Sequence, residues 1–386
     1  MAPSENRVST LHFPAAITDD LVALEPYVPQ QANSFTKLPS KIGKTTWEVW
    51  YFDALSPTGD GAVTISFWRD ATSKDGFRAQ IHALFPDGTS FGAENPLLES
   101  TVQSTPSAGS GSFGVVTGIW RCPASTDGAD SEGEAQFEIA DNGSSARIAF
   151  KLASVKGTVS LAQREGAFRP GNQASGQFTP HVYLVRAIPD AIADVDLSFS
   201  NGRVLRFAGG YGAQQRTWAD LPWPVLMDLS YYLAAQVGPY TIRVMHITSR
   251  LDRAMPYRAS ALLLKDGSPV LEISGGEVVS TTQPSMILRP MFDGGSAGKD
   301  AVKNGEVVRG GFADTNTGFL LDFVDPQGAR HWQFEIRHQR PWWNFPTGPP
   351  QFGTGNSGFL ERVLGGQVEA AEVYEGYGLG GQCTVP

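Results

Sequence analysis

An all-β fold is the class that this sequence predicts, and three observations support the prediction. Dipeptides of the kind that close β-hairpins recur from one end of the chain to the other. They are Asp60-Gly61, Asp87-Gly88, Asn142-Gly143, Asn201-Gly202, Asp266-Gly267 and Asn304-Gly305. Most lie between segments whose apolar residues follow the two-residue period of a strand. Helical periodicity is weak throughout the chain, so sandwiches or barrels are expected.

Residues 47–52 and 77–85 illustrate the alternation. In the first segment, Glu48 and Trp50 lie on one strand face and the odd-numbered positions lie on the other. In the second segment, the odd-numbered positions are apolar, and His82 lies on the opposite, polar face. Both segments are therefore expected to be strands of a sheet.

One segment, residues 224–236, fits a helix better than a strand. Its apolar positions 225, 226, 229, 232 and 233 follow helical spacing, and Gly238-Pro239 would end the helix. A chain of 386 residues exceeds what one core ordinarily holds. We therefore expect two domains, residues 1–223 and 224–386, with the boundary at this segment.

The composition excludes several classes of function. The formal net charge of −9 disfavours nucleic acid or an anionic membrane as the main partner, because both bind basic surfaces. Cys122 and Cys383 are too few for a disulfide framework and are expected to be reduced. Neither a signal peptide nor an apolar run of transmembrane length is evident, so a cytoplasmic protein without membrane insertion is expected.

Two segments match the sequence patterns of known sites, but the residues around them do not fit the structures that those sites need. Residues 376–381 fit G-x-G-x-x-G, but a dinucleotide site needs a helix after the glycines, and the chain has only five more residues. Residues 294–298 fit G-x-S-x-G, but a further turn signal follows where a nucleophile elbow needs a helix. The histidines do not cluster, and His331 and His338 would face opposite sides of one strand, so no metal site is expected.

A carboxylate on an aromatic strand face is the first candidate for chemistry. Glu48 shares its face with Trp50 and Phe52, so it must be hydrogen-bonded, paired or neutral if it is buried. One interpretation is an ion pair with an arginine such as Arg69 or Arg78. The other is a desolvated carboxyl group that hydrogen-bonds the polar head of a substrate.

Aromatic residues gather in two further segments. Residues 209–232 carry Trp223, Tyr231 and Tyr232 in what reads as a loop and a helix, and they fit either a domain-interface core or the wall of a pocket. Residues 340–346 form a proline-rich loop in which Trp342 and Trp343 are adjacent, and a glycine-rich piece with Asn356 follows. At least one of the two tryptophans is expected to meet a ligand or the other domain.

These segments resemble the fungal decalin-forming Diels–Alderases. The resemblance lies in residues 47–53 and 209–223, and in the C-terminal stretches 342–344, 353–355 and 380–382. Those enzymes are distantly similar to carotenoid hydratases of the hydroxyneurosporene synthase type. The resemblance implies an N-terminal β-sandwich, a C-terminal lipocalin-like β-barrel, a pocket between these domains, and no cofactor.

The resemblance also implies roles for individual residues. Glu48 matches the pocket carboxylate of the family, and with Tyr232 and Asn356 it is predicted to be catalytic. Six further residues are predicted to bind the substrate: Trp50, His82, Trp223, Tyr231, Trp342 and Trp343. Trp50 shares the strand face of Glu48. His82 stands where some relatives carry a neutral polar residue.

The predicted function is an intramolecular (4+2) cycloaddition that forms a decalin ring. The substrate would be a linear polyenoyl tetramic acid or a related polyketide–amino-acid intermediate, delivered by a polyketide–peptide synthase. Two alternatives stay open: a lipocalin-like carrier of an apolar metabolite, and a hydratase of the carotenoid-hydratase type. The hydratase would need a strong acid, and Glu48 and Asp53 lie on opposite strand faces.

Overall fold

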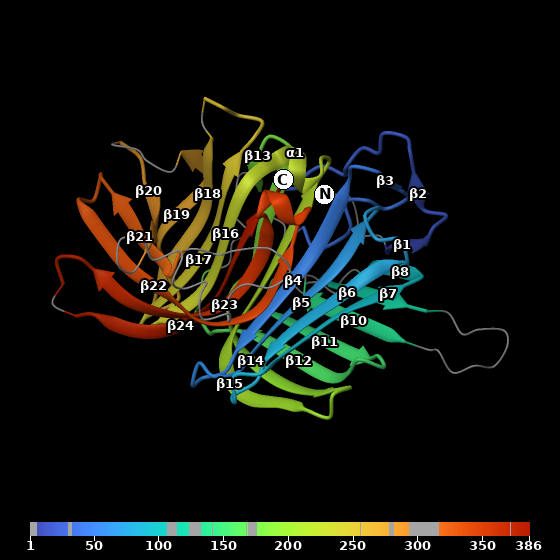
Figure 1. Cartoon of the computed structure of the whole chain (residues 1–386), viewed down its shortest axis with the longest axis horizontal. Coiled ribbons are helices and arrows are strands. Elements are labelled where there is room, and N and C mark those ends of the chain that lie inside the picture. The colour runs from blue at the N-terminus through green and yellow to red at the C-terminus, as the bar shows by residue number, and fades with distance from the viewer. Residues whose placement is uncertain are drawn as a thin grey trace. The chain divides into compact units, whose positions relative to one another are not determined.

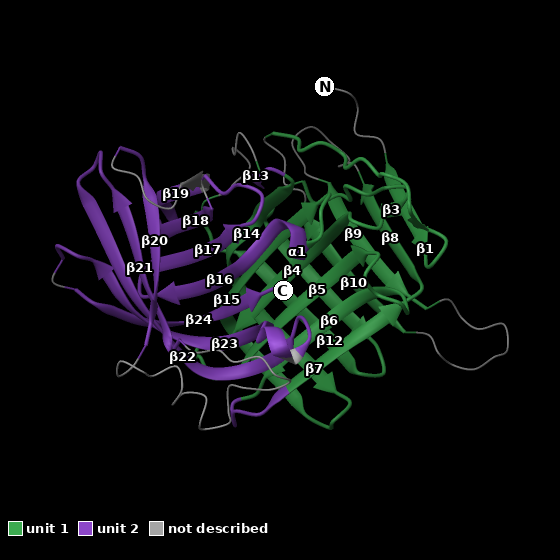
Figure 2. Ribbon diagram, turned by 45° about the horizontal axis from the view of Figure 1, so that its top comes forward, with its two compact units in different colours: residues 1–85, 91–176, 181–222 green, residues 86–90, 177–180, 223–386 purple. Residues whose placement is uncertain are grey.

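The computed structural model divides the chain into two compact units. It describes residues 6–29, 33–105, 114–122, 133–140, 142–166, 168, 176–254, 256–277, 282–292, 316–370 and 372–386. Unit 1 consists of residues 1–85, 91–176 and 181–222, and unit 2 consists of residues 86–90, 177–180 and 223–386 (Figure 2).

Unit 1 is built on one long antiparallel sheet with the strand order β1-β8-β9-β10-β11-β12-β14-β15-β4-β5-β6-β7 (Figure 1). The strands are β1 (Arg7–His12), β4 (Trp47–Leu55), β5 (Ala62–Asp70), β6 (Phe77–Leu84), β7 (Ser90–Leu97), β8 (Glu99–Thr105), β9 (Val115–Arg121), β10 (Glu134–Ala140), β11 (Ser145–Lys151), β12 (Val155–Gln163), β14 (Val182–Phe199) and β15 (Val204–Ala219). A short parallel pair, β2 (Ile17–Thr18) and β3 (Ile42–Gly43), stands apart.

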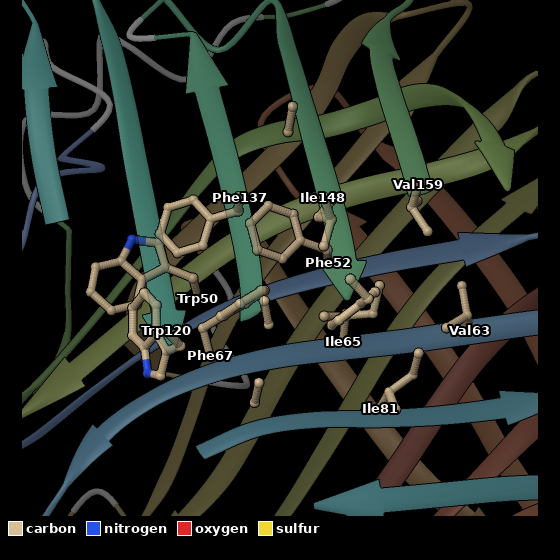
Figure 3. Close-up of a cluster of buried hydrophobic side chains, with 14 of the residues drawn as sticks. Trp50, Phe52, Val63, Ile65, Phe67, Ile81, Trp120, Phe137, Ile148 and Val159 are labelled. Carbon is tan, nitrogen blue, oxygen red and sulfur yellow. The ribbon is translucent and has the colours of Figure 1, made fainter. Parts of the chain in front are cut away.

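The sheet of unit 1 folds over itself, and the core lies between its two layers. Figure 3 shows Trp50 and Phe67 from β4 and β5 facing Trp120 and Phe137 from β9 and β10. The ring centroids of Trp50 and Trp120 lie 5.6 Å apart, and those of Phe67 and Phe137 lie 5.1 Å apart. These edge-to-face pairs are typical of a sandwich core, so the predicted N-terminal sandwich is confirmed.

Unit 2 is an antiparallel sheet with the strand order β19-β18-β17-β16-β24-β23-β22-β21-β20. The strands are β16 (Met227–Val237), β17 (Tyr240–Ser249), β18 (Tyr257–Lys265), β19 (Ser268–Glu277), β20 (Ser285–Met291), β21 (Gly318–Asp325), β22 (Arg330–Pro346), β23 (Gly355–Gln367) and β24 (Tyr374–Thr384). Strand β13 (Gln177–Thr179) also belongs to unit 2 and contacts β18 and β19. The edge strands β19 and β20 approach each other, so the sheet curls into a nearly closed barrel, as predicted.

The predicted helix at residues 224–236 is wrong. The described helices are α1 (Trp223–Leu226) and the 3₁₀ turn η2 (Pro350–Phe352), and the rest of the expected helix is strand β16. Tyr231, Leu233 and Ala235 point into the barrel core with a period of two. Ala234, on the other face, is buried as well. A strand that is apolar on both faces has no clear period, so periodicity cannot separate it from a helix.

The predicted proline-rich loop at residues 340–346 is also wrong, because it is the end of β22. The hairpin dipeptides predicted the structure better than the helical and loop patterns did. Those at 60–61, 87–88, 142–143, 201–202 and 266–267 each lie between two antiparallel neighbours. Gly202 has a φ of +79° and Gly267 a φ of +75°, which glycine adopts without steric cost. Asn304-Gly305 and residues 294–298 lie outside the described residues.

Residues 376–381, which match the letters of the dinucleotide motif, lie inside strand β24. Cys122 and Cys383 are both free. Within the described ranges, no helix is long and apolar enough to cross a membrane. The same residues contain no group of three or more His, Cys, Asp or Glu side chains placed to hold a metal ion.

Candidate active site

Glu48 lies on β4 in the core of unit 1, with none of its surface exposed. Its Oε1 accepts a hydrogen bond from the hydroxyl of Thr36, and its Oε2 accepts one from the backbone N–H of Lys37 at 2.7 Å. Arg216 donates to the same Oε2, and Arg69 Nη1 lies 3.7 Å from Oε1. The ion pair that the sequence left open is therefore present, with Arg216 as its closest partner.

The charged cluster around Glu48 holds the backbone of residues 33–38. Arg216 donates to the carbonyl oxygens of Asn33 and Phe35, and Trp50 Nε1 donates to the carbonyl of Ser34 at 2.9 Å. Burial lowers the pKa of Arg69 and of Arg216 to about 10, so both stay cationic at neutral pH. Within unit 1, Glu48 and Trp50 thus anchor an irregular segment, and their predicted contact with substrate stays a prediction.

His82 lies on the opposite face of the same sheet. It stands in register with Thr64 of β5, which in turn stands in register with Asp53 of β4. Thr64 Oγ1 donates to Asp53 Oδ1 at 2.8 Å. A Cβ at Gly92 would lie 3.0 Å from His82 Nδ1, so this glycine leaves room for the imidazole ring. Burial lowers the pKa of His82 to about 4, which keeps the ring neutral at physiological pH.

In unit 2, four strands place two aromatic residues and two glycines in one row across the sheet. Tyr232 of β16 is in register with Gly381 of β24, Gly381 with Gly358 of β23, and Gly358 with Trp343 of β22. Residues directly opposite each other share a face. We call these four residues, together with Asn356, the glycine row.

The glycines decide how the aromatic rings of this row lie. A Cβ at Gly358 would overlap the Trp343 indole, so that indole lies directly over Gly358. A Cβ at Gly381 would lie 3.7 Å from the same indole and 3.4 Å from the backbone oxygen of Ser357, both ordinary contact distances, so a methyl group fits there without displacing the ring. Tyr232 stands on the other side of Gly381. The row therefore has two glycines between an aromatic residue at each end.

Asn356 supplies an oriented hydrogen-bond donor to the glycine row. Its Oδ1 accepts from Trp343 Nε1 at 2.9 Å, which fixes the amide plane. Its Nδ2 has no hydrogen-bond partner among the described residues. Arg243, with no exposed surface, lies beside Tyr232 with its guanidinium carbon 5.6 Å from the ring centroid. Such a cation is attracted to the ring face and restrains the tyrosine.

Tyr231 faces away from the glycine row and into the barrel core. Its hydroxyl lies 3.4 Å from Oε1 of Glu361, a residue with no exposed surface. His338 Nδ1 lies 2.9 Å from Oε2 of the same carboxylate. Burial raises the pKa of Tyr231 well above its ordinary value, and the nearby Glu361 charge adds to this shift.

The structure therefore brings together Tyr232, Trp343 and Asn356, with Trp342 beside Trp343. Tyr231 lies in the barrel core, and the remaining candidates of unit 1 are Glu48, Trp50 and His82. Trp342 is buried, with its ring centroid 4.9 Å from that of Trp343. Trp223 is half-buried at the first position of α1.

Sequence reasoning missed Arg216, Glu361 and His338 as buried polar groups. For Glu361 a signal existed. It alternates with Phe359 and Val363, which is the same pattern of a carboxylate on an apolar strand face that singled out Glu48.

The chain thus consists of two all-β units, one of which carries the glycine row. Residues 3–386 match the model of a family described as Diels-Alderase-like, and the chain belongs to this family. It is 32% identical over 392 residues to a Diels-Alderase of Gibberella fujikuroi (strain CBS 195.34 / IMI 58289 / NRRL A-6831), covering 98% of each chain. It is 33% identical over 389 residues to the Diels-Alderase phm7 of Pyrenochaetopsis sp, covering 93% of each. The chain is therefore an enzyme of the cycloaddition cyclase class.

Solved structures agree with the fold. The crystal structure of CghA with Sch210972 matches with a TM-score of 0.83 and 27% identity, covering 98% of each chain. The crystal structure of kievitone hydratase from Nectria haematococca matches with a TM-score of 0.50 and 11% identity, covering 94% of this chain and 98% of the other. The second likeness concerns the fold alone.

Proposed function

We propose that this enzyme forms a decalin ring by intramolecular (4+2) cycloaddition. The substrate class is a linear polyenoyl tetramic acid or a related polyketide–amino-acid intermediate, delivered by a polyketide–peptide synthase. The observation that carries the proposal is the glycine row. Two glycines between Tyr232 and Trp343 add no side chains of their own, which suits a planar conjugated chain, and the polar groups of the row are neutral donors.

The reaction needs the diene and the dienophile face to face, and it needs neither a nucleophile nor a net proton transfer. Most of the barrier that a flexible polyene meets is conformational. Holding it in a near-attack fold can remove as much as about 7–11 kcal/mol in the best intramolecular cases. Rigid aromatic walls such as Trp343, fixed by its bond to Asn356, provide such a template and select the face that reacts.

A hydrogen bond to the carbonyl conjugated with the dienophile lowers the barrier further, because it withdraws electron density as the new bonds form. Asn356 Nδ2 and the Tyr232 hydroxyl are the donors for this role in the proposal. Each would contribute about 1–3 kcal/mol if its hydrogen bond strengthens in the transition state. His82, a neutral ring, and Glu48, both in unit 1, stay predicted polar contacts.

The test uses the purified full chain and a synthetic linear polyenoyl tetramic acid. The rate of decalin formation and the diastereomer ratio are followed by chromatography and compared with the uncatalysed reaction. The decisive variant is Asn356→Asp, which keeps an acceptor for Trp343 Nε1 but removes the Nδ2 donor. We expect kcat to fall by about 5- to 150-fold, which corresponds to the loss of one such hydrogen bond.

Asn201→Asp, in the exposed turn between β14 and β15, introduces the same charge far along the chain from the glycine row and serves as the control. Accelerated formation of one diastereomer by the wild type supports the cyclase. If the substrate binds but the rate and the ratio equal those of the uncatalysed reaction, the protein is a carrier and the proposal is wrong.

A further inference from the structure

The buried pair His338–Glu361 lies where strand β22 changes register. From Trp332↔Gln367 to His338↔Glu361, strands β22 and β23 pair without interruption. The register then shifts twice, between His338 and Arg340 and between Pro341 and Trp343. Each shift inserts one extra residue into β22, first Gln339 and then Trp342. Two bulges therefore separate the pair from the tryptophan that lies over Gly358 (β22 and β23 in Figure 1).

The position of these bulges decides which tryptophan stands opposite Gly358. Each bulge adds one residue to β22, so a bulge placed one residue away would change which residue pairs with Gly358. Trp342 and Trp343 are adjacent and have the same side chain. Sequence composition therefore cannot favour one of them over Gly358, and something else must fix the register.

The His338–Glu361 pair has the geometry of a contact that fixes the register of β22 on β23. Glu361 has no exposed surface, and both of its oxygens lie within 3.1 Å of His338 Nδ1. A Cβ at Gly380 would overlap the carboxylate, so the neighbouring strand makes room for it. A buried carboxylate that lost this contact would keep only the Tyr231 hydroxyl, 3.4 Å from Oε1, as a partner in an apolar barrel, which penalises any shifted register.

His338 is held on its remaining sides as well. Its Nε2 lies 3.2 Å from Asn316 Nδ2, and its ring stacks on Phe359 with centroids 3.9 Å apart. Asn316 Oδ1 in turn accepts from Gln382 Nε2 at 3.0 Å. The imidazole thus has one orientation, and through it β22 is tied to β21, β23 and β24 immediately before the bulges.

We infer that His338 and Glu361 are positioning residues that set the register of the bulged segment and so place Trp343, rather than Trp342, over Gly358. Under the proposed function, on which this inference rests, the pair controls stereoselectivity without touching the substrate. Trp343 remains the wall residue, and the pair acts through it.

The test replaces the pair by apolar residues of similar size. His338→Phe combined with Glu361→Leu keeps the volume and the ring stack, and replacing both partners of a buried hydrogen bond by apolar groups of similar shape can be nearly neutral for stability. Glu361→Gln is the conservative variant, because its amide oxygen still accepts from His338. Arg337→Gln, which removes the Arg337–Glu335 contact on the adjacent residue of β22, is the control. Each protein is labelled with 5-fluorotryptophan, and the Trp342 and Trp343 ¹⁹F resonances are assigned by single Trp→Phe changes.

In the apolar double variant we expect both resonances to move and the diastereomer ratio to fall towards the uncatalysed value. Glu361→Gln and Arg337→Gln should leave the resonances and the ratio as in the wild type. Unchanged resonances in the double variant would overturn the inference, whatever the activity. A wild type that does not cyclise the substrate would instead refute the proposed function, and the resonances would still decide whether the pair sets the register. If the double variant does not fold, the same spectra of Glu361→Ala decide in its place.

Discussion

Glu48 is paired with two arginines in the core of unit 1. Removing its charge is therefore expected to lower the stability of the fold before it affects any reaction. Glu48→Gln would leave Arg216 and Arg69 without their anionic partner in a site that has no exposed surface. Removing one member of a buried pair typically costs about 3–5 kcal/mol. We expect a loss of this size in the free energy of unfolding, measured by urea denaturation.

The control for Glu48 is Asp196→Asn, which breaks the exposed pair with Arg206 and should cost less than about 1 kcal/mol. A Glu48→Gln protein that unfolds at the wild-type urea concentration but cyclises substrate slowly would show that the carboxylate acts on the substrate. That outcome would favour the interpretation from family resemblance over the ion pair.

Lys37, in the same segment, should make the stability of the fold depend on pH. Its Nζ donates to the carbonyl of Pro26 at 2.7 Å and to Asn33 Oδ1 at 2.9 Å. Burial, with a contribution from Arg216, lowers its pKa from 10.5 to about 7. Between these two values the unfolded chain binds more protons, so stability rises with pH from about 7 to 10.5. Below pH 7 both states are protonated and this dependence ends.

The measurement for Lys37 is the urea midpoint at pH 7 and at pH 9.5 for the wild type and for Lys37→Met. The wild type should gain more stability over this interval than the variant, which has no amine to titrate. Equal gains would mean that Lys37 is solvated in the folded protein and titrates as it does in the unfolded chain.

At the scale of the strand, the two glycines of the glycine row allow a matched comparison. Gly358→Ala would push a methyl group into the Trp343 indole and displace it, whereas Gly381→Ala would meet the indole at a normal contact distance of 3.7 Å. We expect Gly358→Ala to disturb the Trp343–Asn356 hydrogen bond and to lower kcat. Gly381→Ala should keep that bond and raise KM, because it adds a methyl group where the substrate is proposed to lie.

The readouts for the glycine pair are steady-state kinetics and the indole N–H resonance of Trp343. A Gly381→Ala protein with wild-type kinetics would show that the substrate does not lie on this part of the row. A Gly358→Ala protein with an unshifted indole resonance would contradict the packing described for Trp343.

Strands were predictable where their two faces differ. Residues 47–52 and 77–85 alternate clearly, because one face of each lies in the core of unit 1, and both are strands in the structure. Strand β16 was mistaken for a helix because both of its faces contain buried residues. The bulges of β22 could not be predicted, since a bulge is defined by the register of the partner strand and has no signal in the local sequence.

For the whole molecule, the sequence predicted the all-β class and the hairpins, and it could not predict the order of the sheets. A two-residue turn fixes the pairing of its own two strands. The neighbours β15 and β4, or β16 and β24, are separated by most of a unit, so only the complete pattern of buried faces sets their register. For the same reason, the sequence could not predict that Arg216 pairs with Glu48, because the pairing of β15 with β4 brings these residues together.

Unit 1 contains the half-buried His82 and unit 2 the buried His246, so the whole molecule should lose stability in acid. Burial lowers the pKa of His82 in unit 1 and of His246 in unit 2 from 6.5 to about 4. As the pH falls from about 6.5 to 4, the unfolded chain binds more protons than the folded one, and the free energy of unfolding falls. His82→Asn and His246→Gln should each reduce the difference between urea midpoints at pH 7.5 and pH 5, and His12→Gln, at an exposed ring, should not. If neither His82→Asn nor His246→Gln changes that difference, the acid sensitivity arises from the carboxylates, and the two rings are protonated without opening the structure.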